Sequence, residues 1–120
     1  MSFLSRPPAI GFLRRDISGP RQQFHEAQIR RVAARFGYDL CKTLVFGPET
    51  DRPVHRLRVA VSRTNAEAVF TPSAAHFDGG TVPADLVRVA DVVTVDTEET
   101  YARYATGQVP DQGTQGELIE

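Results

Sequence analysis

Residues 9–46 read AIGFLRRDISGPRQQFHEAQIRRVAARFGYDLCKTLVF and predict, in this order, a strand, a helix and a second strand. The apolar run that opens the segment favours a short strand over residues 9–15. Ser18-Gly19-Pro20 is typical of a helix start, with Ser18 as the N-cap, and apolar residues then recur at helical spacing. Gly37 is suited to end this helix, and the β-branched and aromatic residues of 38–46 predict the second strand.

The alternation of helices and strands continues to residue 95. Asp51 is expected to cap a second helix, with Pro53 in its first turn. The following elements are a strand at 66–71, a loop at 73–82, a short helix at 83–90 and a strand at 91–95. Strands that alternate with helices in this way predict right-handed crossovers. The expected fold is therefore an α/β domain in three layers, α/β/α, around a mainly parallel four-stranded sheet.

The length of 120 residues has room for one such domain, which we place at residues 1–105. Residues 97–104 are expected to form a last helical turn or a docked segment. Residues 106–120 are rich in Gly and Gln and poor in large apolar side chains, which predicts a flexible tail. No apolar run reaches the length of a membrane span, so we expect a cytoplasmic protein without membrane contact. A single cysteine excludes an internal disulfide.

The net charge of −1 hides two halves of opposite sign. Residues 1–64 carry 12 Lys and Arg against 5 Asp and Glu, whereas residues 65–120 carry 2 against 10. A basic half can form a surface for phosphates or for an acidic partner. It can also belong to a dipolar monomer whose two halves neutralise each other across one fold, and the absence of a net positive excess favours this second interpretation.

The order of these pieces resembles the N-terminal catalytic domain of the serine recombinases, the resolvase and invertase family. The resemblance covers about residues 8–100 and rests on short fragments in the right order. These fragments are Phe12-Leu13-Arg14-Arg15-Asp16 at the end of the first strand, Gln28 in the helix, Arg35-Phe36-Gly37-Tyr38-Asp39-Leu40, Asp51-Arg52-Pro53 and the strand Asp91-Val92-Val93-Thr94-Val95.

The resemblance implies a degenerate, catalytically inactive member. In that family a serine attacks a DNA phosphate and clustered arginines stabilise the developing charge. Here the nucleophile position falls on Asp16, and the acidic residue that ends the second strand falls on Gly47. The family's Asp-Arg-x-x-Arg element falls on Ser73, Ala74, Ala75, His76 and Phe77. Only Arg14 and Arg52 match the remaining arginines, so we expect a pseudoenzyme.

Ser18 is the alternative nucleophile, because a shift of two residues would bring it to the family's position. Capping explains the same serine more simply. The resemblance also predicts a truncated domain, since neither the family's long dimerisation helix nor its separate DNA-binding domain follows residue 95 in this sequence.

Two groups of residues could carry other chemistry. Asp16, His76 and Asp78 follow strands and could meet where open α/β folds bind ligands, either as a metal or acid–base set or as ordinary loop polarity. Arg14, Arg15 and Arg52 could form an anion-binding remnant, or they could be ion-paired with neighbouring acids. Cys41 lies within a strand and is expected to be buried. We expect no metal and no cofactor.

Three functions remain open at this stage. The favoured one is a protein-interaction or regulatory module without catalysis, which associates with a partner protein or with itself as a homodimer. The first alternative is a phosphate or nucleotide binder, or an enzyme, that uses the old active-site cleft. The second alternative is a DNA-binding protein, which predicts salt-sensitive association with duplex DNA.

Overall fold

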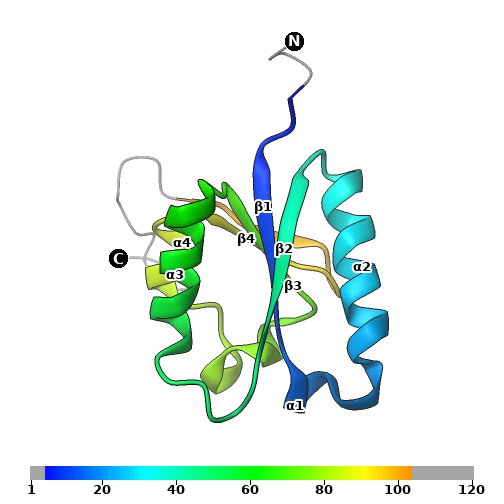
Figure 1. The fold of residues 1–120 in the computed structure, drawn as a ribbon, viewed down its shortest axis with the longest axis vertical. Coiled ribbons are helices and arrows are strands. Elements are labelled where there is room, and N and C mark those ends of the chain that lie inside the picture. Colours follow the sequence, from blue (N-terminus) through cyan, green and yellow to red (C-terminus); the bar gives the residue numbers. More distant parts are fainter. Residues whose placement is uncertain (1–4, 104–120) are drawn as a thin grey trace.

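The computed structural model describes residues 5–103, which form a five-stranded sheet in the order β2-β1-β3-β4-β5. The strands are β1 Pro8–Arg14, β2 Asp39–Phe46, β3 Ala68–Thr71, β4 Asp91–Thr94 and β5 Glu99–Tyr101 (Figure 1). The first four strands are parallel, and β5 pairs antiparallel with β4. The α/β class and the mostly parallel sheet are therefore as predicted. The expected number of strands was wrong, because residues 99–101 form a fifth strand against β4, which agrees with the expectation of a docked segment and not with that of a helical turn. The predicted tail at 106–120 lies outside the described residues.

Helices cover both faces of this sheet. They are α1 Arg15–Ser18, α2 Gln22–Arg35, α3 Pro53–Thr64 and α4 Ala84–Val87, and the predicted loop at 73–82 contains two short 3-10 turns. Helix α2 lies on one face, whereas α3 and α4 lie on the other (Figure 1). No helix within residues 5–103 is long and apolar enough to cross a membrane.

The core is divided by the sheet into two apolar clusters, and β1 contributes to both. Ile10 and Phe12 pack with Leu57 of α3 and Leu86 of α4, while the opposite face of β1 packs with Ile29 of α2. This alternation along β1 is the period-two pattern of a central strand with both faces covered. Strands β3 and β4 are buried on both faces in the same way.

Two predicted helix caps are wrong. Ser18 is buried in the last turn of α1, and its hydroxyl hydrogen-bonds to Nδ1 of His25 at 2.7 Å instead of capping the next helix. Asp51 is not the N-cap of α3, since Arg52 occupies that position in the left-handed region with φ of 47°. The Asp51 carbonyl instead accepts a hydrogen bond from Nε of Arg56 at 2.6 Å.

Cys41 is exposed, so its predicted burial is wrong. The reason is a β-bulge, because Ala9 of β1 pairs with Leu40 whereas Ile10 pairs with Lys42. The extra residue in β2 is left without a partner in the ladder. Beyond the bulge the pairing is regular as far as Phe46.

The close approach of β1 to its neighbours predicts that Gly11→Ala destabilises the protein by roughly 1–2 kcal/mol. A Cβ at position 11 would lie 2.6 Å from Oγ1 of Thr43 and 3.0 Å from Cγ2 of Ile29. The better strand propensity of alanine offsets only part of this crowding. Urea denaturation of both proteins measures the loss.

Combining Gly11→Ala with Thr43→Ala removes the nearest obstacle and should recover part of the lost stability. Two losses that simply add, with no recovery in the double variant, would contradict this explanation.

Candidate functional site

The residues that the sequence singled out gather at the switch point of the sheet. The chain leaves β1 toward α2 on one face and leaves β3 toward α4 on the other, and open α/β folds bind ligands at such a point. Arg14, Asp16, His76 and Asp78 lie there, and we call them the switch-point cluster. The predicted proximity of Asp16, His76 and Asp78 is therefore confirmed, with Arg14 at their centre.

Within this cluster the charges neutralise one another. Nη2 of Arg14 donates to Asp16 at 2.6 Å, and Nη1 donates to Asp78 at 2.9 Å. The hydrogen bond from Arg14 lowers the pKa of the Asp16 carboxyl. Arg15, the next residue, is ion-paired with Glu49 at 2.6 Å. The three carboxylates and the two arginines are thus ion-paired with each other, as in the simpler of the two interpretations of these side chains.

The imidazole of His76 is part of the framework. Its ring is 2% exposed and its Nδ1 accepts a hydrogen bond from the backbone N–H of Arg14 at 2.9 Å. Burial, together with the nearby His25 and Arg14, lowers the pKa of His76 to about 4. The neutral ring therefore ties the loop after β3 to the end of β1. Among residues 5–103 no group of three His, Cys, Asp or Glu side chains is arranged to hold a metal ion.

Ser18 and His25 have the spacing of a nucleophile and its base, but the serine is only 4% exposed. Burial lowers the pKa of His25, and its ring lies against that of His76 at a centroid distance of 5.8 Å. A hydroxyl enclosed in this way has no room for a substrate beside it. The hydrogen bond between Ser18 and His25 thus gives each of these two polar side chains a partner where α1 meets α2.

The remaining positions from the family comparison have structural contacts. Gly47 lies beneath the Arg15–Glu49 ion pair, where a Cβ would be 2.3 Å from Nη2 of Arg15. The Ser73 hydroxyl accepts a hydrogen bond from the N–H of Ala75 at 3.2 Å, while Ala74 begins a 3-10 turn. The Phe77 ring is buried against that of Phe12.

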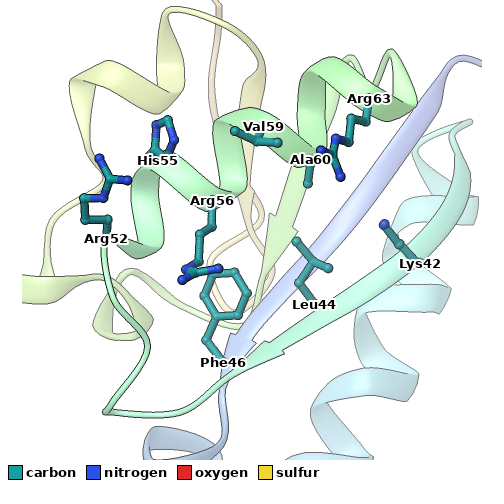
Figure 2. A pocket seen from close by; sticks show the side chains of 9 residues that line it. All are labelled: Lys42, Leu44, Phe46, Arg52, His55, Arg56, Val59, Ala60 and Arg63. Carbon is teal, nitrogen blue, oxygen red and sulfur yellow. The ribbon is translucent and has the colours of Figure 1, made fainter.

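A second site was not predicted from the sequence. A groove of about 440 Å³ lies between α3 and β2, and we call it the basic groove (Figure 2). Its apolar lining consists of Leu44, Phe46, Val59 and Ala60, and its basic lining consists of Lys42, Arg52, His55, Arg56 and Arg63. None of the described residues that line it is acidic. An anionic group inside would therefore face only positive or neutral side chains.

The positions of these side chains follow from the periods of the two elements. Arg56 and Arg63 are seven residues apart in α3 and therefore lie on one side of the helix, whereas Arg52, at the N-cap, lies at its beginning near His55 (Figure 2). Beyond the bulge, Lys42, Leu44 and Phe46 alternate onto the α3 side of the sheet. Lys42 and Arg63 lie toward one end of the groove, and Arg52 and Arg56 toward the other (Figure 2).

Few nearby groups compete for these cations. Asp51 is the nearest recorded carboxylate partner, at 3.8 Å from Nε of Arg52, and its side chain is 79% exposed. No ion pair of Lys42, Arg56 or Arg63 is present among residues 5–103. The left-handed backbone of Arg52 is unusual for a residue other than glycine, and such strain is more frequent at binding sites.

The predicted trio of Arg14, Arg15 and Arg52 is divided between two places. Arg14 and Arg15 bind carboxylates near the end of β1, whereas Arg52 lines the basic groove. The spacing of the arginines in residues 52–63 is the sequence signal for the groove, but the apolar face of the same helix gives the stronger pattern. No family model and no curated protein sequence matches this chain.

Proposed function

We propose that this protein is a non-catalytic interaction domain that binds an acidic protein partner in the basic groove. The observation that carries the proposal is the composition of that groove, where one lysine and three arginine side chains surround an apolar floor. Arginine guanidinium groups bind carboxylates in a planar, two-point manner, and apolar side chains of a partner would cover Leu44 and Phe46. The partner therefore needs both carboxylates for the arginines and apolar side chains for the floor of the groove.

The apolar floor is also the reason for preferring a protein over a phosphate ligand or DNA. Inorganic phosphate would leave Leu44, Phe46 and Val59 uncovered. Duplex DNA is larger than the groove, so its phosphates would also meet the rest of a molecule of net charge −1, whose residues 65–120 alone carry −8. Repulsion from that half opposes non-specific association with a nucleic acid backbone, whereas a short acidic segment need contact only the groove.

The absence of catalysis is part of the same proposal. We assign the domain to a three-layer arrangement like that of the resolvase catalytic domain, with Asp16 in place of the nucleophile. The strand order and the crossovers support this assignment. Arg14, the cation that would have to stabilise a phosphoryl group, is already held by Asp16 and Asp78.

Charge reversal in the groove tests the proposal. The double variant Arg56→Glu/Arg63→Glu should bind a fluorescein-labelled peptide rich in glutamate and valine about tenfold more weakly or worse, because two attractions become repulsions. Arg58→Glu is the control for the single variant Arg56→Glu, which makes the same change in net charge: Arg58 is exposed on the same helix but does not line the groove. Fluorescence anisotropy at low and at physiological ionic strength gives the affinities.

Equal weakening by Arg58→Glu would mean that the protein attracts acidic peptides without using the groove, and the proposal would then be wrong. Stronger binding to a duplex DNA of equal charge, lost in the same double variant, would move the DNA-binding alternative into first place.

Self-association is the second candidate, and the feature that favours it is the exposed edge of β2. A homodimer through this edge predicts a mass that doubles with concentration in light scattering. A constant monomer mass over the same concentration range would contradict it.

A further inference from the structure

We propose that the partner of the basic groove is an extended acidic segment that adds a strand to the free edge of β2. This inference rests on the proposed function and specifies how the partner is held. The segment would carry an acidic residue, then an apolar one and then an acidic one at every second position on the side that faces α3.

The edge of β2 is suitable for such an addition. Within residues 5–103, β2 pairs with β1 on one side and with no strand on the other. From Lys42 to Phe46 its pairing with β1 is regular, and none of these residues is proline. Unpaired backbone groups along about 17 Å of edge can therefore form a parallel or antiparallel ladder with an added segment.

The basic groove runs beside this same edge. Lys42, Leu44 and Phe46 point toward α3. In a strand added at this edge, every second side chain would point to the same face of the sheet and lie beside them. A carboxylate at one end would meet Lys42 and Arg63, and a carboxylate at the other end would meet Arg52 and Arg56 (Figure 2). The side chain between them would lie over Leu44 and Val59, which explains the apolar residue in the middle.

The positive charges beside the β2 edge determine which kind of chain can pair with it. Exposed edge strands commonly carry lysine, because its charge discourages pairing with an unrelated strand. Pairing of two β2 edges would place the cationic side chains of two basic grooves next to each other, which disfavours a second copy of this chain as the occupant. An acidic segment turns the same charges into attractions. The edge is therefore better suited to a chain of opposite sign than to a second copy.

Peptides of one composition and two orders test the inference. A labelled peptide with the core Glu-Thr-Val-Thr-Glu places both acids and the valine on one face of a strand, whereas Glu-Glu-Val-Thr-Thr divides the acids between faces. We expect the full chain to bind the first about tenfold more tightly, since the second can place only one acid over the groove.

N-methylation of the peptide backbone then distinguishes binding by strand addition from binding by charge attraction alone. N-methyl groups on one set of alternate residues of the first peptide should weaken binding about tenfold, because they remove ladder hydrogen bonds, while methylation of the other set should change it little. Hydrogen exchange should also slow at alternate amides between Lys42 and Phe46 when the unmodified peptide is bound.

The outcomes distinguish the two proposals. If both methylated peptides and both orders bind equally well, yet Arg56→Glu/Arg63→Glu still abolishes binding, strand addition is wrong and the acidic partner remains. If the double variant binds like the unmodified protein, both proposals are wrong. If duplex DNA displaces the peptide and binds more tightly, the groove belongs to a nucleic acid.

Discussion

Phe12→Ala is expected to lower the free energy of unfolding by about 3–5 kcal/mol, the range for removing a buried aromatic side chain. Phe12 is 1% exposed on the interior strand β1. Its ring lies 5.5 Å from that of Phe46 and 5.1 Å from that of Phe77. The truncation leaves a cavity between a strand, a helix layer and the loop after β3, none of which can move far to fill it.

Urea denaturation followed by circular dichroism measures this loss. A domain of this size has a total stability of about 5–15 kcal/mol, so the alanine variant should be marginally folded. Phe12→Leu keeps most of the volume and should lose about 1–2 kcal/mol, which leaves a folded protein for comparison. A loss below about 1 kcal/mol for Phe12→Ala would contradict the tight packing of the three rings.

Phe12 also connects the core to the proposed binding site, because Phe46 packs against it from the groove. Phe12→Leu should therefore weaken binding of the acidic peptide while leaving the protein folded. Val93→Ala on the opposite cluster is the matched control, since it truncates a buried side chain that does not contact the groove floor. Equal binding by Phe12→Leu and the unmodified protein would mean that the floor does not depend on this ring.

The elements with strong apolar patterns were predictable, and those stabilised by tertiary contacts were not. The sequence pattern places β1, β4 and the helix before Gly37 close to their observed bounds, because each has a continuous apolar face. Residues 99–101 are exposed and polar, and they form a strand only because β4 offers a partner edge. No local pattern signals such a strand.

Of the two candidate sites, the switch-point cluster could be predicted from the sequence and the basic groove could not. The proximity of Asp16 and Asp78 follows from a general rule, since the carboxyl ends of parallel strands meet at one edge of the sheet. The basic groove depends on which strand lies at the edge and on a bulge that changes the facing of Lys42. Neither is visible locally, and the groove joins residues that are about twenty positions apart.

The charge asymmetry of the sequence is only partly neutralised by the fold. Arg14 pairs with Asp78 and Arg35 with Glu98, so some of the positive first half meets the negative second half as the dipolar interpretation expects. The cations of the basic groove have no such partner in the described residues. These cations are the basis of the proposal that the groove binds an acidic partner.

Acidification from pH 7 to pH 5 should destabilise this protein, because His76 binds a proton less readily in the folded state than in the unfolded chain. The pKa of His76 is about 4 in the fold against 6.5 for an ordinary histidine, chiefly because of burial. Well above pH 6.5 the His76 side chain is neutral in both the folded and the unfolded state, so the free energy of unfolding does not change through this group. As the pH falls from 6.5 toward 4, the unfolded chain binds a proton that the native state refuses, so stability declines by about 2 kcal/mol between pH 7 and pH 5.

His76→Asn separates this effect from other titrations, because the asparagine side-chain oxygen can accept the hydrogen bond from the Arg14 N–H but does not titrate. Urea denaturation of both proteins at pH 7 and pH 5 should show a smaller decline for the variant. Burial lowers the pKa of His25 too, so part of the decline is expected to persist in it. Identical declines in the two proteins would mean that His76 is protonated in the fold. Its Nδ1 would then face the Arg14 N–H as a second donor, and the contact that ties the loop after β3 to β1 would be lost.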